Sequence, residues 1–152
     1  MTARMKSPTE LVPGSLEALR AVGAAAAQSD LPHKTSLLVL LRASQINGCS
    51  VCTTVHARDA RRAGETDERL DAVAAWRDTT FFTDAERAAL ALTEAVTRLS
   101  DRPDGVPDEV YDEASHHYDD PTLAALILTI AVINAFNRLS VPTRQMAGRW
   151  AS

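Results

Sequence analysis

Two cysteines and one histidine are the residues of this chain whose spacing favours chemistry. Cys49 and Cys52 are the only cysteines among 152 residues, and His56 follows four positions after the second. Residues three and four apart in a helix share one face, so the three side chains are predicted to lie together. Two thiols able to form a disulfide beside a base predict a redox site.

The spacing leaves two assignments for the reactive cysteine. His56 lies at i+4 from Cys52, where an imidazole reaches the sulfur and promotes the thiolate, which favours Cys52 as the nucleophile. Attack on a peroxide would give a sulfenic acid on Cys52, and Cys49, one turn away, would convert it into a disulfide. The alternative is that Cys49 has the more stabilised thiolate, because it lies closer to the free N–H groups of a helix start.

Two other interpretations of the motif remain open. The cysteines could be small buried hydrophobic residues, since free cysteine is commonly buried. They could also bind zinc with His56, and a fourth ligand could then come from water, His33, His116 or His117. Three ligands within one helix close a tetrahedron poorly, which disfavours zinc.

A helical hairpin is predicted to position the motif. Residues 35–46 contain an unbroken apolar run from Leu37 to Leu41, which predicts a helix surrounded by protein. Asn47-Gly48 is predicted to end that helix, because Gly or Asn supplies the left-handed residue after a last turn. A second helix is predicted from residue 49 or 50 to Ala63, where Gly64 ends it.

The whole chain is predicted to be all-α, with about seven helices in a single domain over residues 1–152. Residues 1–14 are expected to form an irregular arm that ends at Pro13-Gly14. Further helices are predicted at residues 15–28 with Ser15 as N-cap, 68–76, 85–99, 107–118 and 122–139 with Asp120 as N-cap. Thr83 and Glu86 have the spacing of a capping box. No segment alternates with period two for long enough to predict a strand.

Charge and composition exclude several classes of partner. The net charge of −4 gives no reason to expect nucleic acid or an anionic membrane. Residues 1–10 hold no apolar segment of signal-peptide length, so a cytoplasmic protein is expected. The apolar stretch 123–133 is too short to cross a bilayer and predicts a buried helix. No phosphate loop and no flavin or nicotinamide fingerprint is present, so no cofactor is expected and another thiol must supply reducing equivalents.

The motif and its flanks resemble a known family. The run 41–56, in which Asn47-Gly48 precedes C-x-x-C and His56 follows it, is similar to the signature of the AhpD-like branch of the carboxymuconolactone decarboxylase family. The resemblance continues through residues 62–65, 70–77, 82–90 and 133–139, and therefore covers most of the chain from about residue 34 to 140.

The resemblance implies an all-α subunit that forms a homo-oligomer, commonly a trimer or hexamer. It also implies thiol-dependent reduction of hydroperoxides, with regeneration by an external dithiol. In that pattern Cys52 attacks the peroxide, Cys49 resolves the sulfenic acid, and His56 belongs to the proton relay. The decarboxylases of the same family lack the C-x-x-C motif, which argues against lactone chemistry.

Two positions depart from the family pattern. The relay of the AhpD-like branch includes a glutamate twelve residues before the first cysteine and a histidine just before the second, and here Leu37 and Val51 occupy these positions. Apolar surroundings disfavour a thiolate, so Cys52 is predicted to be a weaker nucleophile than in the full relay. The alternative functions are therefore a non-catalytic or redox-sensing oligomer, and lactone decarboxylase-type activity.

Other residues have both a functional and a structural interpretation. Glu94 could replace the missing relay acid, or it could be a half-exposed helix residue near Arg87 and Arg98. Asn134 and Asn137 could face the thiols, or they could bond backbone groups at helix ends or form a subunit contact. The large aromatic residues are expected to be core or subunit-contact residues: Trp76, Phe81, Phe82 and Trp150.

Overall fold

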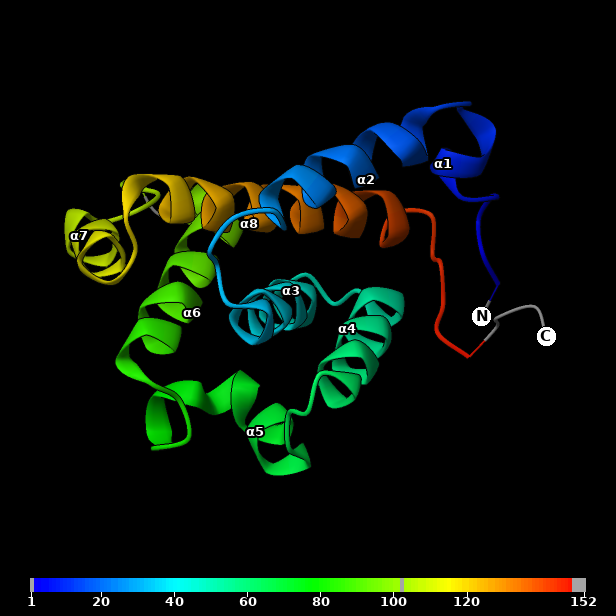
Figure 1. Ribbon diagram of the computed structural model, residues 1–152. Helices are drawn as coiled ribbons and strands as arrows, with labels where there is room; N and C mark the ends of the chain where they lie inside the picture. The colour runs from blue at the N-terminus through cyan, green and yellow to red at the C-terminus, as the bar shows by residue number, and fades with distance from the viewer. Residues whose placement is uncertain (1, 102, 149–152) are drawn as a thin grey trace.

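The computed structural model describes residues 2–101 and 103–148 (Figure 1). Within these residues the chain forms eight α-helices and two 3-10 helices and contains no strand, which confirms the all-α prediction. The α-helices are α1 (Pro8–Leu11), α2 (Ser15–Ala26), α3 (His33–Ile46), α4 (Ser50–Arg62), α5 (Asp67–Ala72), α6 (Asp84–Thr97), α7 (Asp108–His117) and α8 (Asp120–Ser140). The 3-10 helices are η1 (Val73–Asp78) and η2 (Leu99–Asp101). Trp150 lies outside the described residues.

Helix α3 is the central element of the fold. Figure 1 shows it nearly end-on in the middle of the molecule, with α4 and α6 on either side and α8 crossing above it. Its residues Leu38 and Val39 are fully buried, and Leu41 is 2% exposed. Burying each such side chain stabilises the fold by about 1.5–3 kcal/mol. The predicted helix surrounded by protein is confirmed, although it begins at His33, two residues before the predicted start.

Helix α8 is the longest element and closes the core. By length and composition it is apolar enough to cross a membrane, but it packs against α2, α3 and α6, with half of its apolar window inside the protein. The predicted helix is present, but it is buried on one side only, and it is longer than the apolar stretch that was judged too short to cross a bilayer. Its N-cap is Asp119 rather than Asp120, because the Asp119 carboxylate accepts the N–H of Thr122 at 3.1 Å. Pro121 then occupies the first turn, where a missing N–H costs nothing.

The segment predicted as one helix over residues 68–76 is divided into α5 and η1. Thr66 caps α5, and Ala75 leaves helical geometry within η1. Arg87 explains the tightened turn, because its guanidinium donates to the carbonyl oxygens of Trp76, Arg77 and Thr79. These carbonyls are thus satisfied from α6 rather than by continuing the helix.

The N-terminal region differs from the prediction in two details. The predicted irregular arm contains the short helix α1, which Pro8 starts at a first-turn position. Helix α2 begins after Gly14, which has φ +81°, and Ser15 donates its hydroxyl to the carbonyl of Val12 instead of capping the helix. The arm continues along the C-terminal tail, where the N–H of Arg4 donates to the carbonyl of Thr143 at 2.9 Å.

Candidate functional site

The connection between α3 and α4 fixes the position of the cysteines. Gly48 has φ +67°, and its N–H donates to the carbonyl of Gln45 at 3.2 Å. The N–H of Cys49 donates to the carbonyl of Ser44 at 3.0 Å. These two bonds form a Schellman motif, which confirms that Asn47-Gly48 ends the first helix. Cys49 therefore follows α3 after only Asn47 and Gly48, and it is also the N-cap of α4, which begins at Ser50.

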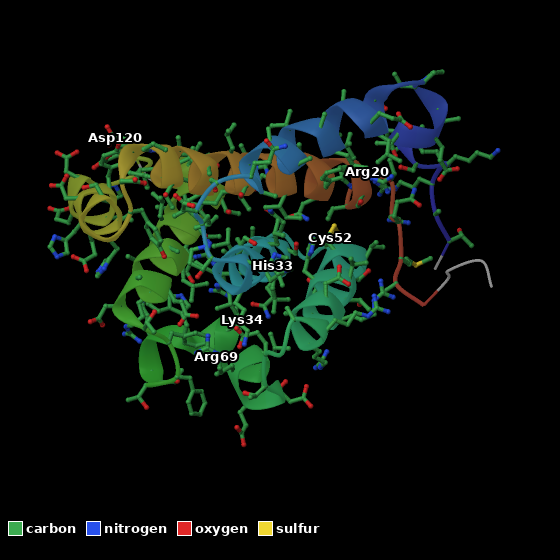
Figure 2. All side chains as sticks on the ribbon, viewed as in Figure 1. Arg20, His33, Lys34, Cys52, Arg69 and Asp120 are labelled. Atoms are coloured by element: carbon green, nitrogen blue, oxygen red, sulfur yellow. A yellow bond between two sulfur atoms is a disulfide. The ribbon has the colours of Figure 1, made fainter. Side chains whose placement is uncertain are left out.

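The two cysteine sulfurs lie at disulfide distance. The Cα atoms of Cys49 and Cys52 are 5.4 Å apart, and the Cys52 N–H donates to the Cys49 sulfur at 3.3 Å. Figure 2 shows Cys52 at the start of α4 with its sulfur directed toward α8. Cys49 is 1% exposed and Cys52 is 7% exposed. The spacing thus brings the sulfurs together, and Cys52 is the one closer to solvent.

The surroundings of the sulfurs are apolar. The cysteine pair packs against Ala43 and Leu40 of α3, and against Ile133 and Phe136 of α8. Val51, which takes the place of the relay histidine, borders the same cluster. Leu37, which takes the place of the relay glutamate, is 5% exposed and packs in the core with Leu38 and Leu41. Hydrocarbon occupies both relay positions.

His56 lies on the inner face of α4. It is four residues from Cys52 and four from Ala60, and both of these are buried. Burial lowers the pKa of His56 and outweighs the nearby Asp59 carboxylate, which raises it. The neutral imidazole is therefore favoured near pH 7, and a neutral imidazole accepts a proton.

A buried polar network holds the α3–α4 connection against α8. The side-chain amide of Asn47 donates to the side-chain oxygens of Asn134 at 3.0 Å and Asn137 at 2.9 Å. Asn137 donates to the Ser44 hydroxyl at 3.3 Å, and Asn134 donates to the Thr97 hydroxyl at 3.1 Å. The network positions the segment that leads into Cys49.

The network shows what Asn134 and Asn137 bind. It also includes residues that were not predicted from the sequence. Asn134 also donates to the carbonyl of Ile130 at 2.9 Å, but this carbonyl lies in the middle of α8 and not at a helix end, where the structural interpretation expected the bond. The contribution of Ser44 and Asn47 was not anticipated. The sequence did contain a signal for this network. Ser44 and Asn47 lie three residues apart at the end of one apolar helix, and Asn134 and Asn137 lie three residues apart within another.

Glu94 lies in a separate set of residues, the Glu94 cluster, formed with Arg42, Trp76 and Arg77. Its carboxylate accepts from Arg42 Nε at 2.7 Å and Arg77 at 2.6 Å, and from the Trp76 indole at 3.0 Å. Burial raises the pKa of Glu94, but the hydrogen bonds from Arg77, Trp76 and Arg42 lower it by a larger amount. The net shift of the pKa is therefore downward. Glu94 therefore stays ionised near pH 7. The expected exposure of Glu94 is wrong, since Glu94 is buried and Arg87 binds carbonyls instead, but the expected neighbour Arg98 does lie near it, at 3.8 Å.

The apolar cluster around the cysteine pair does not include Trp76, Phe81, Phe82 or the remaining histidines. Trp76 and Phe82 are buried in the core, and Phe81 is exposed. His33 and His116 are exposed, and the His117 ring contacts Glu113 at 3.1 Å. Among residues 2–101 and 103–148, no three histidine, cysteine or acidic side chains are placed to hold a metal ion. The histidines suggested as a fourth zinc ligand do not join the cysteines.

Comparisons with known proteins agree with this architecture. The family model described as Carboxymuconolactone decarboxylase family matches residues 13–95. The uncharacterized protein YdfG of Bacillus subtilis is 36% identical over 132 residues, which are 87% of this chain and 88% of YdfG. The uncharacterized protein YnjA of Escherichia coli is 34% identical over 114 residues, which are 74% of this chain and 60% of YnjA.

Solved structures share the fold. A protein of unknown function from Agrobacterium tumefaciens, ATU0492, provisionally assigned as the antioxidant defence protein AhpD, superposes with a TM-score of 0.88 and 29% identity. The superposition covers 95% of this chain and 98% of ATU0492. The debrominase Bmp8 superposes with a TM-score of 0.73 and 21% identity over 87% of this chain and 70% of its own, a likeness of fold alone. The matched family model and the relationship to YdfG show that the chain belongs to the carboxymuconolactone decarboxylase family.

Proposed function

We propose that the protein reduces hydroperoxides by thiol chemistry at Cys52 and Cys49. The Cys52 thiolate attacks one peroxide oxygen, so that an S–O bond forms, the O–O bond breaks, and the leaving oxygen is protonated to an alcohol or water. Cys49 then attacks the sulfenic sulfur, releases water and closes the disulfide. An external dithiol reduces this disulfide by exchange and is itself oxidised to a disulfide.

The observation that carries the proposal is a pair of cysteines held at disulfide distance at the start of α4. Cys52 is 7% exposed and Cys49 is 1% exposed, so Cys52 is the better placed of the two to meet a peroxide. Cys49 lies behind it at the helix N-cap, where a short movement closes the disulfide. The pair thus suits an attacking and a resolving role.

His56 supplies the proton transfer in this proposal. Burial keeps its imidazole neutral near pH 7, so it takes the Cys52 thiol proton and returns it to the leaving oxygen. With Leu37 and Val51 at the other relay positions, His56 acts without a second acid. A slower peroxidase than one with the full relay is the expected result. The provisional assignment of ATU0492 to antioxidant defence supports the same chemistry.

Turnover with a small organic hydroperoxide and dithiothreitol tests the proposal. The wild type should consume many equivalents of peroxide, and Cys52→Ser should lose more than about a hundredfold in rate, as expected on removing a nucleophile. Assayed without dithiothreitol, which would itself reduce the sulfenic acid, Cys49→Ser should consume about one equivalent and then stop, because its sulfenic acid has no resolving thiol. Wild-type rates in the Cys52→Ser variant would refute the assignment.

The burial of both sulfurs favours a second candidate, a redox-sensing protein. Slow access through the apolar cluster of Leu40, Ile133 and Phe136 suits a dithiol that is oxidised once and kept oxidised. Such a protein would consume one equivalent of peroxide without cycling, whichever dithiol is supplied. The same assay therefore separates the two candidates.

We also propose that the protein acts in the cytoplasm as a homo-oligomer, a trimer or hexamer. Helix α8 leaves Ala124, Leu128 and Ala131 exposed at helical spacing, and Leu128 is 43% exposed. An exposed apolar stripe of this kind is typical of a subunit contact. Sedimentation velocity should show the oligomer in the wild type and a smaller species in Leu128→Glu. No nucleic acid or membrane takes part in this proposal.

A further inference from the structure

A pocket of about 210 Å³ lies between α2, α3 and α8, and neither cysteine lines it. Its walls are mainly apolar, with Gly23 and Ala26 from α2, Leu37 and Leu40 from α3, and Val132 from α8. An apolar cavity of about 150 Å³ holds a benzene molecule, so this pocket has room for roughly eight non-hydrogen atoms.

The hydroxyl groups around the pocket already have partners. Thr129 donates its hydroxyl to the carbonyl of Ala125 at 2.8 Å, and Ser36 donates to the carbonyl of His33 at 2.7 Å. His33 is exposed, so its ring belongs to the rim rather than the interior. A charged group placed inside would lose water without gaining an ion partner. The lining therefore selects an uncharged, apolar molecule.

Gly23 keeps the pocket open. A Cβ atom added at this position would meet Val132 Cγ1 at 3.8 Å, an ordinary contact, and no other surrounding atom within 4 Å. A longer side chain at residue 23 would therefore extend into the pocket without disturbing the helix. Leu37 contributes in a second way, because a carboxylate at its position would put a charge in the wall.

The pocket adjoins the cysteine site through Leu40. This side chain lines the pocket and also packs against the cluster of Cys49, Cys52 and Ile133. On α8, Val132 lines the pocket and Phe136 borders the cysteine cluster, one turn or about 6 Å further along the helix. A molecule in the pocket would thus lie one side chain away from the cysteines.

We propose that this pocket binds an uncharged apolar molecule, of the size of one aromatic ring with a short substituent, against Leu40 and beside the cysteine pair. Binding requires no peroxide chemistry, so the inference goes beyond the proposed function and does not depend on it.

Methyl NMR of the full chain tests the proposal, with benzyl alcohol as the probe and benzoate as its charged counterpart. Benzyl alcohol should shift the methyl signals of Leu37, Leu40 and Val132 saturably. Benzoate should bind at least about tenfold more weakly, because its carboxylate must be desolvated. Gly23→Leu should weaken benzyl alcohol binding at least about tenfold, because the new side chain fills the space.

Ala24→Leu is the matched control, since Ala24 is exposed on the same helix and does not line the pocket. It should leave the affinity within about twofold. Absence of saturable shifts in the wild type would overturn the proposal, including the case in which a side chain of a second copy fills the pocket. Equal affinities in wild type and Gly23→Leu would also overturn it. The same titration on Cys52→Ser should give the wild-type affinity, which separates this test from the peroxidase test.

Discussion

The cysteine site and the Glu94 cluster both include residues of α3, but they differ in their surroundings. The Glu94 carboxylate has charged hydrogen-bond partners, whereas the sulfurs are surrounded by hydrocarbon. Arg42 reaches toward α6, where Glu94 accepts hydrogen bonds from two arginines and an indole. On the side of α4 and α8, Ala43 and Leu40 surround two sulfurs with hydrocarbon. The two regions are therefore one saturated ion cluster and one nearly charge-free site.

This difference suggests that the Glu94 cluster contributes mainly to the stability of the fold and the cysteine site mainly to thiol reactivity. A buried carboxylate that accepts from several donors stays ionised and fixes three segments of the fold, but it has no free capacity for proton transfer. The cysteine site has no such partner, so in the proposed reaction its chemistry depends on His56 and on the helix start at Cys49. Changes in the Glu94 cluster should affect stability, and changes around the cysteines should affect thiol behaviour.

Breaking the Glu94 cluster should give the largest loss of stability. Glu94→Gln leaves Arg42, whose side chain is only 12% exposed, without its charge partner, which should lower the free energy of unfolding by about 3–5 kcal/mol. Urea denaturation measures this change. Glu113→Gln is a suitable control, because Glu113 is exposed, and its effect should stay within about 0.5 kcal/mol. A loss below about 1 kcal/mol in Glu94→Gln would contradict the account of the cluster.

Removing one asparagine should affect both stability and thiol access. Asn137→Ala takes partners from Asn47 and Ser44, which should cost about 1–3 kcal/mol. The loosened α3–α4 connection should also let iodoacetamide reach reduced Cys52 faster, as followed by intact mass. In Glu94→Gln, studied under conditions where it is folded, the alkylation rate should remain that of the wild type. Equal rates in Asn137→Ala and wild type would mean that the network does not position the cysteines.

Two glycine-to-alanine substitutions should change the free energy of unfolding in opposite directions. Gly48→Ala forces a side chain into the left-handed region at φ +67°, which should destabilise the protein by about 1–2 kcal/mol. Gly23 is helical, and an added Cβ makes only an ordinary contact, so Gly23→Ala should stabilise by about 0.5–1 kcal/mol. Thermal unfolding compares the two variants. A stabilising Gly48→Ala would exclude the Schellman geometry.

The smallest expected effect is a pH dependence caused by His56. The pKa of His56 is lowered in the folded protein, so the unfolded chain binds the proton more tightly. Its contribution to stability is therefore complete above its ordinary pKa of 6.5 and is lost as the pH falls through the folded value. Denaturation at several pH values should show a shallower decline in His56→Gln than in wild type. Identical slopes would show that His56 is not buried as described.

The local features of the site were predictable from the sequence because short-range rules govern them. Asn47-Gly48 predicted the end of α3, the C-x-x-C spacing predicted the paired sulfurs, and Thr83 with Glu86 predicted the capping box of α6. Each of these depends on residues within a few positions of one another. The family resemblance was also confirmed.

The features that were missed depend on contacts distant in sequence. The pairing of Glu94 with Arg42 spans 52 residues, and nothing near Glu94 indicates it. The break between α5 and η1 follows from carbonyls bound by Arg87 of α6 rather than from a local helix breaker. The network of Asn47 with Asn134 and Asn137 joins α3 to α8 in the same manner.

Trapping of the sulfenic acid tests the central claim most directly. Reduced Cys49→Ser and Cys52→Ser proteins would each receive one equivalent of hydroperoxide together with dimedone, and intact mass would report the adduct. The account predicts rapid labelling of Cys49→Ser at Cys52 and little labelling of Cys52→Ser. Labelling of Cys52→Ser alone would reverse the two roles, and labelling of neither variant would contradict a peroxide-reactive thiol in this site.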